Sequence, residues 1–189
     1  MTKGIVIGFV LAIAISVCCV FVYFSAGLAP VATADPPMPF EKKLASMALD
    51  AHIEKQRIPP SPVPADEPNF LAGASVYQQH CALCHGLPGQ PAIDYATTMF
   101  PKPPQLFRGK GVTDDPVSET YWKTVNGIRL SGMPSFKTRL TDTEAWQVSQ
   151  LLAHANEITE SVKKVLIPDS PKSASAPPLA PASRKDSVK

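Results

Sequence analysis

The first strong pattern in the chain is a run of apolar residues over positions 4–24 that contains no charge. A helix of about 20 apolar residues is long enough to cross the hydrocarbon core of a bilayer. The run therefore predicts one transmembrane helix, inside an N-terminal anchor of residues 1–34 that contacts the lipid bilayer. A cleaved secretory signal is the alternative, because Lys3 precedes the run and an Ala-x-Ala pattern ends at Ala34. Signal-peptide cores are shorter, at roughly 7–15 residues, which favours the anchor.

A proline-rich linker with one amphipathic helix is predicted over residues 35–68. Between positions 40 and 57 apolar side chains recur at helical spacing and form one stripe. We expect this stripe to pack on the following domain rather than on a membrane surface, because the polar face carries both signs of charge. The repeated prolines of residues 58–68 exclude a regular helix or a central strand and mark a domain boundary. The stripe consists of Phe40, Leu44, Met47, Ala48 and Ala51.

Helical patterns dominate the next segment, residues 69–166. The stretch "FLAGASVYQQHCALCHG" has apolar residues at helical spacing, and "PVSETYWKTVNGI" runs helically to a stop at Gly127. The stretch "TDTEAWQVSQLLAHANEITESV" opens with Thr141 and Glu144, the pattern of a capping box. No stretch alternates as a strand, so the predicted fold class is all-α. Residues 167–189 are rich in Pro, Ala, Ser and Lys and are predicted to be disordered.

Composition limits what the cysteines can do. The chain has 189 residues, 21 prolines, four cysteines and a formal net charge of +2, which allows one domain of ordinary size plus its attachments. Two of the four cysteines fall in the apolar run, so only Cys81 and Cys84 remain for the soluble part. Two cysteines cannot build a disulfide framework.

Three chemistries compete for Cys81, Cys84 and the adjacent His85. A zinc site needs four ligands, usually two close pairs, and the soluble part has no second Cys/His cluster. A redox dithiol needs a strand leading into the motif, whereas the preceding residues have a helical pattern. Covalent haem attachment fits, because cysteines three apart on a helical turn face the same way. Both sulfurs can then add to the haem vinyl groups, with His85 as the proximal iron ligand.

A methionine is the predicted second iron ligand. Met133 follows Cys84 by 49 positions (133 minus 84) and stands between a glycine and a proline. Glycine allows close approach to a flat cofactor, and proline stiffens the loop. Met99 is the rival, 14 positions after His85 (99 minus 85), in a loop that we expect on the proximal side of the haem. We predict that Met133 is the ligand and that Met99 packs in the haem wall.

With a helix, the C-x-x-C-H motif, a loop, the methionine and a C-terminal helix in this order, residues 70–158 resemble the class I cytochromes c. The resemblance implies one covalently attached haem c and a close crossing of Gly73 and Tyr77 with the C-terminal helix. It also implies that the Pro104 carbonyl accepts the Nδ1 hydrogen of His85 and that Leu106 lines the haem. An aromatic residue usual in that last helix is replaced by Leu151. The predicted site is Cys81, Cys84, His85, Met133, Pro104 and Leu106, with His85 and Met133 binding the iron.

One-electron transfer is the expected function, rather than an enzymatic reaction. Iron bound by histidine and methionine has no open position for a substrate, and the thioether favours the ferrous state. Expected partners are redox proteins at the membrane, and no nucleic acid. The resemblance implies a single-pass protein of the bacterial inner membrane with its haem domain in the periplasm. Two alternatives stay open: a cytochrome subunit of a larger respiratory oxidoreductase complex, and a haem peroxidase or sensor whose Met133 dissociates.

Overall fold

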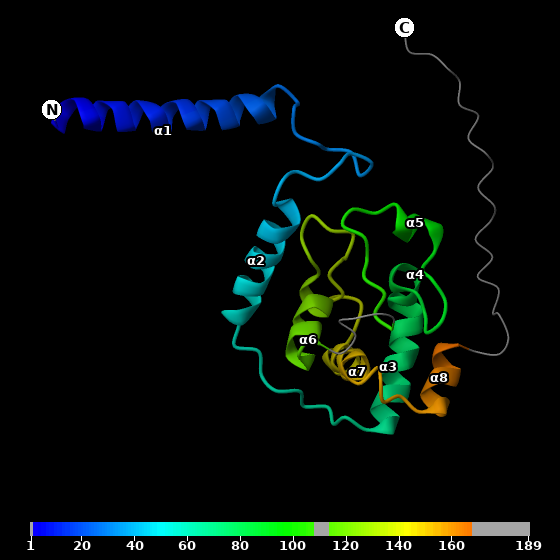
Figure 1. Cartoon of the computed structure of the whole chain (residues 1–189). Helices are drawn as coiled ribbons and strands as arrows, with labels where there is room; N and C mark the ends of the chain where they lie inside the picture. The colour runs from blue at the N-terminus through cyan, green and yellow to red at the C-terminus, as the bar shows by residue number, and fades with distance from the viewer. Residues whose placement is uncertain (1, 108–113, 168–189) are drawn as a thin grey trace, which may run out of the picture.

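The computed structural model describes residues 2–107 and 114–167, and every regular element in these ranges is a helix (Figure 1). The all-α prediction is therefore confirmed, with a single isolated bridge between Leu87 and Gln90 as the only β-type pairing in the described ranges. The tail predicted to be disordered lies, apart from Ile167, outside the described residues. The helices are α1 (Thr2–Ser25), α2 (Glu41–Glu54), α3 (Glu67–His80), α4 (Ala82–His85), α5 (Asp94–Thr97), α6 (Val117–Asn126), α7 (Asp142–Ala153) and α8 (Glu160–Leu166).

Helix α1 stands apart from the helical domain (Figure 1). It contains no buried residue, and its large apolar side chains are exposed along its whole length. By length and composition it is able to cross a membrane, as the apolar run predicts. The helix extends slightly beyond the predicted span at both ends.

The domain core forms where α3 crosses α7. A Cβ atom added at Gly73 would lie 2.8 Å from the backbone carbonyl carbon of Gln147 and 3.2 Å from the Cβ of Leu151. Only glycine allows this approach, as the resemblance to class I cytochromes c implies. Tyr77 and Leu151 are both fully buried at this interface. The tyrosine hydroxyl donates a hydrogen bond of 2.7 Å to the carbonyl of Gly86, which ties the helix crossing to the cysteine motif.

Gly73→Ala is expected to destabilise the domain. Alanine favours a helix by about 1 kcal/mol relative to glycine, but the added methyl would collide with the α7 backbone, which cannot rotate away. The collision outweighs the propensity, and we expect a net loss of about 2 kcal/mol in the free energy of unfolding. Denaturant unfolding followed by circular dichroism would measure it, with the exposed Gln78→Ala as control on the same helix. A Gly73→Ala protein as stable as the wild type would contradict the close crossing.

Aromatic stacking joins α6 to α7. The rings of Tyr121 and Trp146 are parallel, with centroids 3.8 Å apart and an interplanar angle of 6°, and Trp146 is buried. The Tyr121 hydroxyl donates a hydrogen bond to the Asp142 carboxylate, and this bond is the main reason that the pKa of Tyr121 rises to about 12. The capping box of Thr141 and Glu144 begins α7, as its sequence pattern predicts.

The C-terminal helical pattern is interrupted, which the sequence analysis did not predict. Helix α7 ends at Ala153, with His154 as its C-cap. Helix α8 begins at Glu160, with Thr159 as its N-cap. The interruption lets α8 fold back on α3, where Val162 and Leu166 are fully buried in the core.

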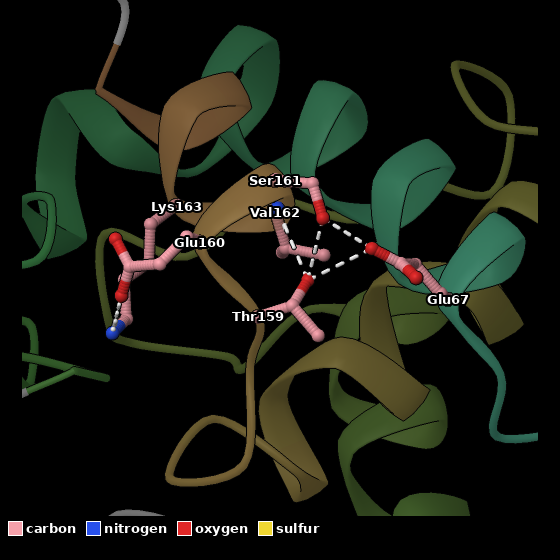
Figure 2. Close-up of polar contacts among 6 residues, drawn as sticks. All are labelled: Glu67, Thr159, Glu160, Ser161, Val162 and Lys163. Carbon is pink, nitrogen blue, oxygen red and sulfur yellow. Dashed lines mark hydrogen bonds and ion pairs between the residues drawn. The ribbon is translucent and has the colours of Figure 1, made fainter.

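Hydrogen bonds fix the start of α8 to the start of α3 (Figure 2). The Glu67 carboxylate accepts a hydrogen bond of 3.0 Å from the Thr159 hydroxyl and another from the Ser161 hydroxyl. These bonds, that of Ser161 first, lower the pKa of Glu67. The N-cap of α8 thus also positions the helix on its neighbour.

The predicted packing of the α2 stripe is wrong. Phe40, Leu44 and Met47 are exposed, and the opposite side of α2 is directed at the domain, with Ile53 buried and the His52 ring 5.5 Å from that of Trp122. The segment that follows α2 helps to determine which side of the helix faces the domain. It is fixed to α7 by a hydrogen bond of 2.7 Å from Gln150 Nε2 to the carbonyl of the buried Val63. His52 is itself exposed.

Candidate functional site

The cysteine motif forms a single helical turn at the end of α3. The Cys81 amide closes α3 by donating 2.8 Å to the Tyr77 carbonyl, and the Cys81 carbonyl accepts from the amides of Cys84 at 3.1 Å and His85 at 2.9 Å. Both thiols are free and half-buried. Burial, followed by the neighbouring Cys84, raises the pKa of the Cys81 thiol to about 12. The turn therefore carries two neighbouring thiols and an imidazole within five residues.

The His85 ring is oriented by a backbone carbonyl. Its Nδ1 lies 2.8 Å from the oxygen of Pro104, which can only accept a hydrogen bond, so Nδ1 carries the hydrogen. The lone pair of Nε2 is then free to bind a metal. Burial lowers the pKa of His85, although the bond to Pro104 opposes this effect. The neutral ring, which is the form that ligates metals, is favoured.

The segment around Pro104 is fixed next to the cysteine turn. Leu106 is half-buried and packs against the domain core, and Phe107 meets Tyr77 edge to face at 4.9 Å. Gly86 has φ +72°, and a Cβ atom added there would lie 2.8 Å from the backbone carbonyl oxygen of Gln90, so any other residue is strained at this position. Gln105 Oε1 is buried without a hydrogen-bond partner in the described part of the chain.

A short, tightly folded loop after α6 carries Met133. The Ile128 amide donates 3.2 Å to the Met133 carbonyl, and the Met133 amide donates 3.2 Å to the Ser131 hydroxyl. Gly127 has φ +68°, and a Cβ atom there would lie 2.6 Å from the Pro134 carbonyl carbon. The loop is thus folded back on the end of α6 at a glycine that no other residue replaces without strain.

Two contacts bring the methionine loop to the other parts of the site. The His80 ring, which directly precedes Cys81, lies 6.0 Å from the Phe136 ring in an edge-on arrangement. Met99 extends over Gly132: an added Cβ there would lie 3.4 Å from Met99 Sδ and closer still to its Cε. Met99, expected on the proximal side, therefore touches the loop of Met133.

Two aromatic side chains of α6 have protein partners in the structure. Tyr121 bonds to Asp142, and the Trp122 ring faces His52 on α2. Arg129 is exposed beside the methionine loop.

The donor set of the site fits a covalently attached haem. Two thiols on one turn can form thioethers, and an oriented neutral imidazole and a methionine thioether are borderline and soft iron ligands. Exposed apolar side chains occur on the cysteine turn, the α5 segment and the methionine loop, as expected of a site for a large apolar ring: Leu83 is 62% exposed, Tyr95 62% and Leu130 92%. Among the described residues, no group of three or more His, Cys, Asp or Glu side chains could hold a metal ion, so these residues do not assemble the four-ligand zinc set.

Comparison with known proteins agrees with this chemistry. The family model of cytochrome c oxidase, cbb3-type, subunit III, matches residues 68–152 of the chain. This range contains the cysteine motif, Pro104, the methionine loop and most of α7. No curated protein and no solved structure matches the chain. The segment 68–152 is therefore a c-type cytochrome domain.

Proposed function

We propose that this protein is a membrane-anchored one-electron carrier with one covalently bound haem c. Cys81 and Cys84 hold the haem by thioether bonds, and His85 and Met133 bind its iron. Pro104 orients His85, and Leu106 lines the haem. The observation that supports the proposal best is the 2.8 Å contact between His85 Nδ1 and the Pro104 carbonyl beside the two thiols.

The protein contributes a fixed ligand environment. When bound, the haem supplies an iron centre that gains and loses one electron. His85 stays neutral and keeps its orientation, because its Nδ1 hydrogen is donated to a carbonyl on a fixed segment. The Met133 thioether stabilises ferrous iron relative to ferric iron and raises the potential. With His85 and Met133 both bound, the iron would have no free coordination position for a substrate.

The tether places this carrier near its partners. Helix α1 anchors residues 1–34 in the bacterial inner membrane, residues 35–68 form the linker, and residues 69–166 form the haem domain in the periplasm. Anchoring raises the effective concentration of the haem domain near membrane-bound redox proteins. A tethered haem domain therefore does not need a strong excess of surface charge to meet these redox proteins.

A stable place in a larger respiratory oxidoreductase complex is the second candidate. The observation that favours it is the family match, because the matched family is named for subunit III of a cbb3-type cytochrome c oxidase. Solubilisation of native membranes in mild detergent, followed by size separation, distinguishes the two. A free carrier migrates alone, whereas a subunit migrates at fixed stoichiometry with a second metalloprotein.

Potentiometric titration tests the shared claim of both candidates. The purified, haem-loaded protein is expected to titrate reversibly as a single one-electron couple, because it has one haem with both axial positions occupied. Absorbance in the visible range during a stepwise reductive and oxidative titration measures this. Two couples in one chain, or a couple lost after one cycle, would contradict the proposal.

A further inference from the structure

No described part of the chain covers the face of α2 that carries the stripe. We use the name α2 stripe for Phe40, Leu44, Met47, Ala48 and Ala51, all of which are exposed. The exposed fractions of the three large side chains are 74%, 61% and 57% in that order. Positions 40, 44, 47 and 51 share one side of a helix, and Ile53, which is buried, lies on the opposite side. Helix α2 therefore has two apolar faces, of which the domain covers one.

The stripe begins beside the end of the anchor. The chain turns back after α1 (Figure 1). Tyr23 and residues 27–30 line the same hollow as residues 35–39. The Asp35 carboxylate fixes this turn by accepting hydrogen bonds from the amides of Val31 and Ala32, at 3.2 and 3.0 Å. The first residue of the stripe thus lies next to the point where α1 leaves the bilayer.

An aromatic residue with an unusual backbone conformation is exposed at this point. Phe40 has φ +64°, a left-handed conformation that is uncommon for bulky residues, and its side chain is the most exposed of the three large side chains of the stripe. The Glu41 carboxylate accepts 2.8 Å from the Met38 amide and so fixes the entry into α2. Phenylalanine and leucine are typical of the apolar face of helices that lie in the membrane interface.

Charges of both signs occur near both ends of α2. Lys42 and Lys43 are exposed in the first turn, next to the anchor, where Glu41 is held by its hydrogen bond to the Met38 amide. Asp50 and Glu54 are in the second half and line a hollow shared with α6. Exposed lysines beside an apolar face favour contact with anionic headgroups.

We propose that the α2 stripe lies in the headgroup region of the bilayer that α1 spans, and so holds the haem domain against the membrane surface. The inference rests on the proposed anchoring by α1. It commits to lipid as the occupant, because the stripe continues from the anchor and two exposed lysines, Lys42 and Lys43, lie in the first turn of α2.

Spin labels in the full-length, haem-loaded protein test this contact. Cys18→Ser with Cys19→Ser gives a background without reactive anchor thiols, into which Met47→Cys and, as the matched control, Ser46→Cys are introduced. Both positions are exposed and adjacent in sequence, but they lie on different sides of α2. The protein is reconstituted in vesicles of phosphatidylethanolamine and phosphatidylglycerol. Collisions of each label with oxygen, which concentrates in lipid, and with a water-soluble nickel chelate are then measured.

The label at position 47 is expected to show a ratio of oxygen to nickel collisions several-fold higher than the label at position 46. Equal ratios at the two positions in vesicle-bound protein would place the stripe in water and overturn the inference, with the anchor and the haem unaffected. A label at position 47 that is immobilised and shielded from both reagents would show that protein covers the stripe, which also overturns it. Absence of the protein from the vesicle fraction would overturn the anchor together with the stripe.

Discussion

Replacement of both Cys81 and Cys84 by alanine is expected to abolish the retention of haem by the denatured protein. Thioether bonds are the only links that survive unfolding, since axial ligation by His85 and Met133 is lost with the fold. Acid-acetone extraction followed by haem staining or intact mass measures the retention. The matched control is Cys18→Ser with Cys19→Ser, which removes the two exposed thiols of α1 and should retain all of the haem.

The single variants sharpen this test. Cys81→Ala and Cys84→Ala each keep one thiol on the same turn, so each is expected to retain haem through one bond, at reduced yield. The intact mass of the wild type should exceed that of the polypeptide by one haem. Retention of haem by the double alanine variant, or loss of haem from the wild type in acid-acetone, would contradict attachment at this turn.

Replacement of Met133 by histidine is expected to keep a six-coordinate haem and to lower its potential substantially. Axial ligands set haem potentials over a range of about 0.8 V, and imidazole stabilises ferric iron relative to a thioether. Met133→Ala should remove the weak sulfur-to-iron band at the red end of the ferric spectrum. Potentiometry and visible absorption measure both effects.

The contact between Met99 and Gly132 makes a matched control necessary. Met99→Leu keeps a side chain of similar volume without the sulfur, so it preserves packing on Gly132. We expect this variant to retain the sulfur-to-iron band and a potential near that of the wild type. Loss of the band in Met99→Leu, with the band intact in Met133→Ala, would show that Met99 rather than Met133 is the iron ligand.

Local signals in the sequence predict much of the site. The turn from Cys81 to His85 is short, and the cysteine spacing alone places both sulfurs on one side of it. The helix crossing at Gly73 is implied by the family resemblance, and the structure shows that only a missing side chain allows the two backbones to approach this closely. The contact of Pro104 with His85 spans 19 residues and is likewise implied by the family resemblance rather than by any local pattern.

Local sequence patterns do not predict which of several apolar surfaces will be buried against the domain. The periodicity of α2 identifies its apolar stripe but not which of two faces the domain covers, and the contacts of Ile53 and His52 decide this. The break between α7 and α8 arises because Val162 and Leu166 are better buried against α3 than along a continued helix. Met99 reaches Gly132 through a loop whose path no periodicity describes.

Binding of carbon monoxide by the reduced wild-type protein tests most directly whether this cytochrome domain is an electron carrier. Carbon monoxide binds ferrous haem that has an open or labile axial position, and it shifts the visible spectrum when it does. With His85 and Met133 both bound, the account predicts an unchanged spectrum of the reduced protein under carbon monoxide and a ferric spectrum that keeps the sulfur-to-iron band. Rapid and complete formation of the carbon monoxide complex in the folded protein would contradict it, and would assign the site to a peroxidase or a gas sensor instead.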